Sequence, residues 1–410
     1  MEKQKCPAVR FKEHREGWRE LPLTSIFGKI RNAFVGTATP FYVKKGNFYL
    51  ESNNVKDGKI NKKTQIFIDD YFYLKQRDKW LKTDDLVMVQ SGHVGHSAVI
   101  SEELNNSAAH ALIMFSDYKV QTNPHFLNYQ WQTNSAKKAI EKIATGNTIR
   151  HILSSDMKEF LSFFSSYEEQ TQIGNFFQNL DQSISLQEKK LTQTQNLKKA
   201  MLEKMFPKEG SKQPEIRLKG FSGDWDKKLL QDEVEFFSGL TYSPDDLTNK
   251  NGTLVLRSSN VQNNQICTDD NVYVVHDAVN VCNVEVGDII VVVRNGSRSL
   301  IGKHAVINKQ MKNTVIGAFM TGVKAKNPYF INALFDTSLF DLAVSRNLGA
   351  TINQITTGMF KQMEFKFPDT TEQIAIGQFF KKIDETLVLQ QQQLQTLKNL
   401  KQAFLGKMFV

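Results

Sequence analysis

The chain has 410 residues, which is long for a single hydrophobic core and predicts two or more domains. With 40% hydrophobic and 23% charged residues it has the composition of an ordinary soluble globular protein, and no run of 18 apolar residues exists that could span a membrane. The formal charge of +9 favours polyanionic partners, nucleic acid among them.

The N-terminal stretch, MEKQKCPAVRF, lacks the apolar core of a signal peptide, so we expect a cytoplasmic protein. The three cysteines, Cys6, Cys267 and Cys282, show no CxxC spacing, and we interpret them as reduced structural thiols. His93 and His96 form an H-x-x-H pair, but the other ligands of a metal site are missing. We therefore expect no bound metal.

Residues 1–165 are predicted to form a first domain of mixed strands and short helices. Four stretches mark this domain, and each of them recurs in the second half of the chain. In chain order they are VRFKEHREGW ending at Trp18, SNNVKDGKI from Ser52, DLVMVQSG from Asp85, and GNTIRHILSSDMKEF from Gly146. The third is an apolar strand that leads into an almost uncharged loop.

Residues 166–207 are predicted to form one long helix. Its apolar residues are spaced alternately by four and three positions, which is typical of a coiled-coil seam. Ser166 and Glu169 fit a capping pattern at its start, and Pro207 stops it. At 1.5 Å per residue, the 38 repeated residues 169–206 make a rod about 57 Å long. The seam residues are Ile173, Phe177, Leu180, Ile184, Leu191, Met201 and Met205.

Residues 208–368 open with a polar linker, KEGSKQP at 208–214, and are predicted to form a second domain. The four marker stretches return in the same order. They read IRLKGFSGDW ending at Trp225, SSNVQNNQI from Ser258, DIIVVVRNG from Asp288, and GATINQITTGMFKQM from Gly349. Between these stretches the two halves of the chain differ freely.

Residues 369–410 repeat the long helix. EQTQIGNFFQNLDQ from Glu169 aligns without a gap with EQIAIGQFFKKIDE from Glu372, and both copies end in Lys-Met-Phe. Agreement of this length marks a duplication. Asp369 repeats the capping pattern, and we expect the end of the chain to stop this helix. Its seam residues are Ile376, Phe380, Ile383, Leu387, Leu394, Leu397, Phe404 and Met408.

Polar residues interrupt the seam at the same places in both copies, Gln187 with Gln390 and Lys198 with Lys401. A polar seam residue costs stability and often fixes register or partner, although a coil that is merely loose there would show the same pattern. Because both copies carry the same seam, the simplest pairing is one copy against the other.

This organisation resembles the specificity subunit of type I restriction–modification enzymes, over essentially the whole chain. The shared motifs are the helix ends LTQTQNLKKAMLEKMF from Leu191 and LQTLKNLKQAFLGKMF from Leu394, and ATGNTIRHI with its weaker partner LGATINQIT. The resemblance implies an α+β fold, in which two tandem target-recognition domains of mixed α/β structure are joined by a long antiparallel two-helix coiled coil. An internal pseudo-twofold repeat relates the halves.

The resemblance also implies a non-catalytic subunit of a bacterial defence complex. In that family each recognition domain reads one half of a bipartite double-stranded DNA target, and divergent domains imply an asymmetric target. Two methyltransferase subunits dock on the helices and methylate adenine N6 with S-adenosylmethionine. Two motor–nuclease subunits, which need ATP and magnesium, complete the restriction enzyme. This chain is expected to bind none of these cofactors itself.

Two other functions compete with the recognition-subunit interpretation. A self-contained methyltransferase needs an Asn/Asp-Pro-Pro-aromatic motif, but NPHF at Asn123 and NPYF at Asn327 lack the second proline and read as ordinary helix starts. No G-x-x-x-x-G-K-[ST] phosphate loop occurs either. The alternative is a coiled-coil scaffold that does not read DNA. The basic charge and the divergence of the two domains count against it.

The best candidates for DNA contacts follow the apolar strand of the second domain, in the stretch VVVRNGSRSLIGKHAV. Arg and Lys donate to phosphates, and Arg, Lys, Asn and Gln also read base edges. A solvated hairpin tip is the alternative interpretation. The candidates are Arg294, Asn295, Ser297, Arg298, Lys303 and His304, together with Arg257, Ser259 and Asn260 of the RSSN turn.

The matching loop of the first domain, SGHVGHSAV, is nearly uncharged, so its DNA contacts would be made differently. Asn and Ser at strand ends are also ordinary turn residues, which is the alternative for several of these positions. The candidates are Gln90, Ser91, His93 and Arg150, with Lys44, Lys45, Asn53 and Asn54.

Overall fold

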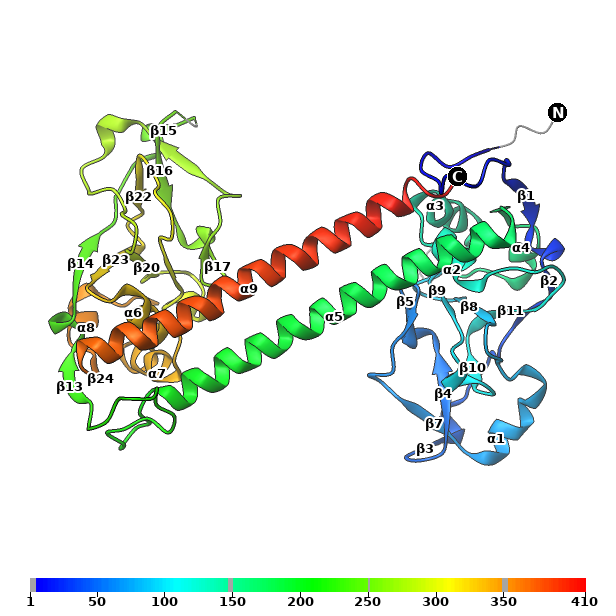
Figure 1. The fold of residues 1–410 in the computed structure, drawn as a ribbon, viewed down its shortest axis with the longest axis horizontal. Helices are drawn as coiled ribbons and strands as arrows, with labels where there is room; N and C mark the ends of the chain where they lie inside the picture. Colours follow the sequence, from blue (N-terminus) through cyan, green and yellow to red (C-terminus); the bar gives the residue numbers. More distant parts are fainter. Residues whose placement is uncertain (1–4, 147–149, 250, 349–352) are drawn as a thin grey trace. The chain divides into compact units, whose positions relative to one another are not determined.

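The computed structural model describes residues 5–146, 150–249, 251–348 and 353–410. They form two compact units: unit 1 is Met1–Glu188 with Gln393–Val410, and unit 2 is Lys189–Gln392 (Figure 1). Each unit therefore contains one sheet-rich domain and parts of both long helices. None of the helices in the described ranges is both long and apolar enough to cross a membrane.

Unit 1 contains two four-stranded sheets, with strand orders β2-β11-β8-β9 and β10-β4-β7-β3. The first sheet is antiparallel throughout, whereas β10 pairs parallel with β4 in the second. The strands are β2 Phe27–Asn32, β3 Tyr42–Val43, β4 Asn47–Glu51, β7 Ile66–Ile68, β8 Leu86–Val89, β9 Ser97–Val99, β10 Ala108–His110 and β11 Leu112–Tyr118. A strand pair, β1 Arg19–Pro22 with β12 Leu161–Phe164, and a hairpin, β5 Val55–Lys56 with β6 Lys59–Ile60, complete it.

Unit 2 repeats this topology strand for strand. The order β14-β23-β20-β21 corresponds to β2-β11-β8-β9, and β15-β19-β16-β22 corresponds to β3-β7-β4-β10, including the one parallel pair. The strands are β14 Val234–Ser238, β15 Leu247–Thr248, β16 Thr253–Leu256, β19 Val272–Val274, β20 Ile289–Val292, β21 His304–Val306, β22 Thr314–Ile316 and β23 Met320–Ala325. The pair β13 Asp226–Leu229 with β24 Glu364–Phe367 and the hairpin β17 Val261–Gln262 with β18 Gln265–Ile266 match those of unit 1.

The short helices follow the same repeat. Asn123 caps the helix that starts at Pro124, because its side chain accepts a hydrogen bond from Phe126 N, so NPHF is a helix start as the sequence predicted. Pro328 likewise occupies the first turn of its helix. The helices are α1 Asp70–Lys75, α2 Pro124–Trp131, α3 Asn134–Ile143 and α4 Ser154–Lys158 in unit 1, and α6 Pro328–Phe335, α7 Ser338–Asn347 and α8 Thr357–Lys361 in unit 2.

The two long helices are α5 Tyr167–Met205 and α9 Thr370–Leu405. Both predicted caps are present, since Ser166 Oγ accepts from Glu169 N at 3.3 Å and Asp369 Oδ1 accepts from Glu372 N at 3.0 Å. The prediction for the other end of α9 was wrong, because the helix stops at Leu405. The residues that follow turn into the core of unit 1, where Met408 and Phe409 are buried.

The long helices pair antiparallel within each unit, which confirms the predicted coiled coil. In unit 1, Gln187 Nε2 donates to Gln393 Oε1 at 3.1 Å, and the Phe176 ring meets Phe404 edge-on. As the residue number rises along α5, the number of its partner in α9 falls, so the two helices run in opposite directions. Unit 2 shows the same direction, with Lys198 against Asp384 and Phe206 against Phe380.

A buried ion pair fastens the start of each long helix to its domain. Glu169 is fully buried and accepts from Arg10 Nε at 2.5 Å, Arg10 Nη2 at 2.8 Å and Trp18 Nε1 at 3.1 Å. Glu372 is also fully buried and accepts from Arg217 Nε at 2.8 Å and Nη2 at 2.6 Å. The repeated stretch ending at Trp18 or Trp225 thus supplies an arginine that satisfies a helix carboxylate.

Glu169→Gln is expected to lower the free energy of unfolding by about 3 kcal/mol, because it removes one partner of a buried ion pair. The control is Glu168→Gln, which changes the same residue type at the exposed neighbouring position. Urea denaturation of both variants measures the difference. Equal small effects would show that the Arg10 contact contributes little.

Asp85, which opens the marker stretch before β8, makes stability depend on pH. Burial raises the pKa of its carboxyl to about 6, against the hydrogen bond from Lys82 N. Because this pKa lies above the unfolded value of about 3.9, the stabilising contribution is present below about pH 4 and is lost as the pH rises through 6. Wild type should therefore lose about 2 to 3 kcal/mol relative to Asp85→Asn over this range. Urea denaturation at pH 4 to 7 tests this, and a difference that does not vary with pH would contradict it.

Candidate nucleic-acid interface

The loop between β20 and β21 in unit 2 displays the strongest predicted DNA contacts. It follows a strand whose four residues are all buried, so the chain leaves the sheet directly into solvent. Arg294, Ser297, Arg298 and Lys303 are exposed on this loop. All but Ser297 carry a positive charge, and the four are close in sequence, which suits a phosphate backbone.

Two other segments support this loop. Asn295 Nδ2 donates to Ser258 Oγ at 3.0 Å, which ties the loop to the turn before β17. Arg294 forms an isolated antiparallel bridge with Gln354. Gln354 belongs to the stretch LGATINQIT, so the described end of that motif lies against the loop, and residues 147–149 and 349–352 of the two motif copies fall outside the described residues. Asn295 is half-buried and acts as a support.

Sequence reasoning missed one residue of this surface. Phe319 is 54% exposed, and the Arg294 guanidinium lies over its ring at 5.0 Å from the centroid. An exposed aromatic ring beside an exposed arginine offers a face for a base or sugar in addition to charge. Nothing in the stretch VIGAFM distinguishes an exposed phenylalanine from a core residue, so the sequence carried no usable signal.

In unit 1, the loop between β8 and β9 makes the same backbone contacts but carries different side chains. Ser91 forms an antiparallel bridge with His151, the counterpart of the bridge between Arg294 and Gln354, and its hydroxyl hydrogen-bonds the His151 ring. Gly92 N donates to Arg150 O at 3.1 Å. The structure therefore brings Ser91, His93 and Arg150 together, with His93 and Arg150 exposed.

Two asparagines predicted to contact DNA are structural turn residues. Asn54 is buried, with Nδ2 donating to Asn61 O at 2.9 Å and Thr64 O at 2.8 Å, while its Oδ1 accepts from Glu51 N. Asn260 is buried in the same way, with Nδ2 donating to Cys267 O at 2.9 Å. Their amides are occupied, so the prediction was wrong and the turn interpretation is right.

His304 and Gln90 are also poorly placed for DNA. His304 is 4% exposed, with Nδ1 at 2.9 Å from Gly302 O and Nε2 at 3.2 Å from Asp336 Oδ1, because it begins β21 on its buried face. Gln90 is 8% exposed beneath its loop. We correct both predictions on this ground.

The other predicted DNA contacts lie outside the two loops that follow β8 and β20. Arg257 is half-buried and pairs with Asp270 at 2.9 Å, and Ser259 is half-buried beside it. Asn53 is exposed in the turn before β5. Lys44 and Lys45 are exposed in the turn after β3, the edge strand of the other sheet, and so belong to a different surface feature.

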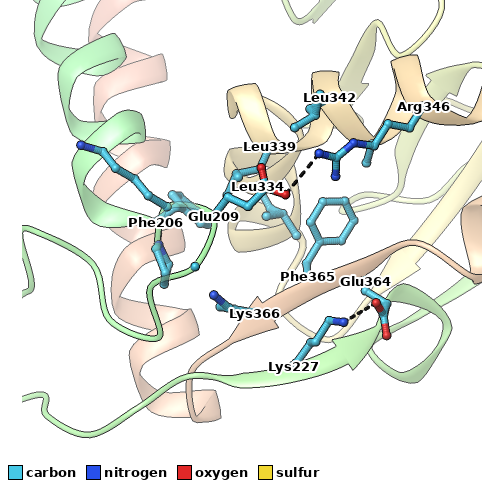
Figure 2. Close-up of a pocket in the computed structure, with 14 residues that line it drawn as sticks. Phe206, Glu209, Lys227, Leu334, Leu339, Leu342, Arg346, Glu364, Phe365 and Lys366 are labelled. Carbon is cyan, nitrogen blue, oxygen red and sulfur yellow. Dashed lines mark hydrogen bonds and ion pairs between the residues drawn. The ribbon is translucent and has the colours of Figure 1, made fainter.

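Unit 2 also contains a pocket of about 420 Å³ at the end of α5 (Figure 2). Its floor is apolar, with Phe206, Leu334 and Phe365, and charged side chains surround it. Lys227 pairs there with Glu364, and Arg346 Nη2 lies 3.2 Å from Glu209 Oε1. Lys227 and Arg346 are thus each paired with a carboxylate, whereas Lys366 donates to Ser211 O.

Within the described ranges, no group of three or more His, Cys, Asp or Glu side chains is placed to hold a metal ion. Burial lowers the pKa of His96, and Asp57 at 3.7 Å opposes that shift. His96 Nδ1 also accepts a hydrogen bond from Asp57 N at 3.2 Å.

The two units share one topology, and each contains matching segments of the two long helices. Residues 222–399 match the family model described as the type I restriction modification DNA specificity domain. The match lies in the second half of the chain, and the first half repeats the matched half in sequence and strand order.

Solved structures show the same fold. The chain is similar to the S subunit of the type I restriction–modification system from M. genitalium, with a TM-score of 0.67, 15% identity and 99% of each chain covered. A second structure comes from work on the complex assembly and conformational transition of the type I R-M system. It matches with a TM-score of 0.53 and 15% identity, over 96% of this chain and 97% of that one.

Replacing both Arg294 and Arg298 with alanine is expected to weaken DNA binding and to reduce the salt slope by about 2, because two phosphate-directed cations are lost. The control replaces two exposed lysines elsewhere in unit 2, Lys326 and Lys361, with alanine. Fluorescence anisotropy at several salt concentrations measures both quantities. Unchanged affinity and slope in the arginine variant would remove this loop from the interface.

Proposed function

We propose that this chain is the DNA sequence-recognition subunit of a type I restriction–modification complex. One observation carries the proposal: the two units present chemically different loops in the same backbone frame. Unit 2 offers Arg294, Arg298 and Lys303, whereas unit 1 offers Ser91 and His93. Different donors in one frame suit two different half-sites, so the target is bipartite and asymmetric.

The long helices supply the unread gap between the half-sites. A helix of 39 residues is about 58 Å long at 1.5 Å per residue. That length exceeds one turn of DNA, which is about 34 Å, so it is sufficient to hold two half-sites apart. A scaffold that ignores DNA would leave both the divergent loops and the matched frame without a role.

Catalysis belongs to partner subunits in this proposal. The helices expose apolar side chains off the seam, which are suited to docking two methyltransferase subunits. These are Leu186, Leu197, Leu389 and Leu400. The methyltransferases would modify adenine N6 with S-adenosylmethionine, and two motor–nuclease subunits would use ATP and magnesium for restriction. This chain supplies recognition and placement.

Replacing residues 1–165 with the first domain of a relative is expected to change one half of the methylated motif and to leave the other half intact. The reason is that each domain reads its half-site independently. Single-molecule sequencing of adenine methylation, in cells with the cognate methyltransferase and with or without this gene, measures the motif.

The control is the deletion strain supplied with the intact gene, which should restore the original split motif. Methylation that is unaltered by loss of the gene would overturn the proposal. A scaffold role or a different partner enzyme would then explain the chain better.

A further inference from the structure

Each lysine that interrupts the seam forms an ion pair with an aspartate of the other long helix. Lys198 Nζ lies 2.6 Å from Asp384 Oδ1, and Lys401 Nζ lies 2.8 Å from Asp181 Oδ1. The two lysine side chains are only 12% and 15% exposed. Each pair joins α5 to α9, so these positions link the helices and are not loose points in the coil.

In unit 1 the recognition domain is bonded to this ion pair. Tyr129 of α2 donates its hydroxyl to Asp181 Oδ2 at 2.8 Å, and Lys59 of the β5–β6 hairpin lies 3.3 Å from Oδ1. Burial and the nearby carboxylate raise the pKa of Tyr129, so its hydroxyl keeps its proton. Asp181 of α5 therefore contacts both Lys401 of α9 and the recognition domain.

In unit 2 the shared group is the lysine. Lys198 Nζ lies 2.7 Å from Asp336 Oδ2, directly after α6. Asp336 also contacts His304, the first residue of β21, and accepts a hydrogen bond from Asn264 in the turn of the β17–β18 hairpin. Burial opposes the charge on Lys198, but Asp336 and Asp384 outweigh it and raise its pKa.

These clusters are a second contact between each domain and the helices. The first is apolar: Phe177 and Phe409 pack on Phe126 in unit 1, and Phe206 and Phe380 occupy the core of unit 2. Apolar contacts resist separation but are not directional, whereas charged hydrogen bonds demand a particular geometry. Asp181 lies one helical turn beyond Phe177, so a directional contact follows the apolar one along the helix.

The same clusters reach the candidate DNA loops through the hairpins. In unit 1, Asp57 N in the hairpin turn donates to His96 Nδ1 at 3.2 Å, beside Lys59. In unit 2, Ser258 before β17 accepts from Asn295, while Asn264 contacts Asp336. Each hairpin therefore connects the helix pair to the loop that follows β8 or β20.

We propose that Tyr129 and Asp336 are positioning residues, which hold each recognition domain at a fixed orientation on the helix pair and so enforce the gap between the half-sites. They touch no DNA themselves. This inference rests on the proposed function, because a gap exists only if the chain reads two half-sites.

The test uses Tyr129→Phe and Asp336→Asn, which keep the shape of each side chain and leave the lysine–aspartate pair between the helices in place. Each full-length variant is assembled with its methyltransferase, and binding is measured to duplexes with the native gap and with one base pair added or removed. Both variants should lose about tenfold of their preference for the native gap, the effect of removing one hydrogen bond to a charged group. Discrimination between correct and mismatched bases within each half-site should be retained.

Matched controls change the same chemistry away from the helices. Tyr73→Phe removes a tyrosine hydroxyl that donates to Asn106 O at 2.9 Å, and Asp245→Asn changes an exposed aspartate in the turn before β15. Both controls should reject altered gaps as wild type does. Should Asp336→Asn fail to fold, Tyr129→Phe, which loses one oxygen atom, still decides the question.

Two outcomes would overturn the inference. Variants that reject altered gaps as strongly as wild type assign no positioning role to these groups. Variants that lose binding to every duplex alike show a purely structural role. If wild type itself binds no split target, the proposed function has failed first, and the two failures are thereby distinguished.

Discussion

The requirement that each long helix bury its apolar stripe organises this molecule. The stripe of α5 is covered at its start by the core of unit 1 and at its end by the core of unit 2, where Met205 and Phe206 are buried. The stripe of α9 is covered in the same way, with Ile376 in the core of unit 2 and Leu405 in the core of unit 1. No domain is complete without a helix segment that is distant in sequence, so the helix pair is part of both cores.

Because of this constraint, the backbone that both units share can be told apart from the loops whose side chains differ between the units. Both units have the same strand order, hairpin, helix cap and arginine–carboxylate pair. These repeated features determine the course of the backbone in each unit. The loops after β8 and β20 occur twice in position but differ in chemistry. A frame fixed by buried contacts can carry new loop side chains without a loss of fold.

The duplication predicted much of this from the sequence. It indicated two similar domains, two long helices that pair with each other and both helix caps, because matched motifs fold alike, while the antiparallel direction was implied by the resemblance to the family. It could not show which polar residues are exposed. Asn54 and Asn260 resemble groove-reading residues, yet the Nδ2 groups of both donate to backbone carbonyls of their own turns. His304 lies inside because all three residues of β21 are buried, and the role of Lys198 was ambiguous because its partner Asp336 is remote in sequence.

The last residues of α9 carry a consequence for synthesis on the ribosome. Leu405, Met408 and Phe409 fill the core that also holds Trp18 and Phe126, and Val9 N donates to Lys407 O at 2.9 Å. The first domain is therefore translated early but cannot close until residues 405–409 emerge. Through most of translation it exposes an apolar surface, whereas domains generally fold as soon as they are made. A premature stop just before Leu405 would damage the domain that was made first.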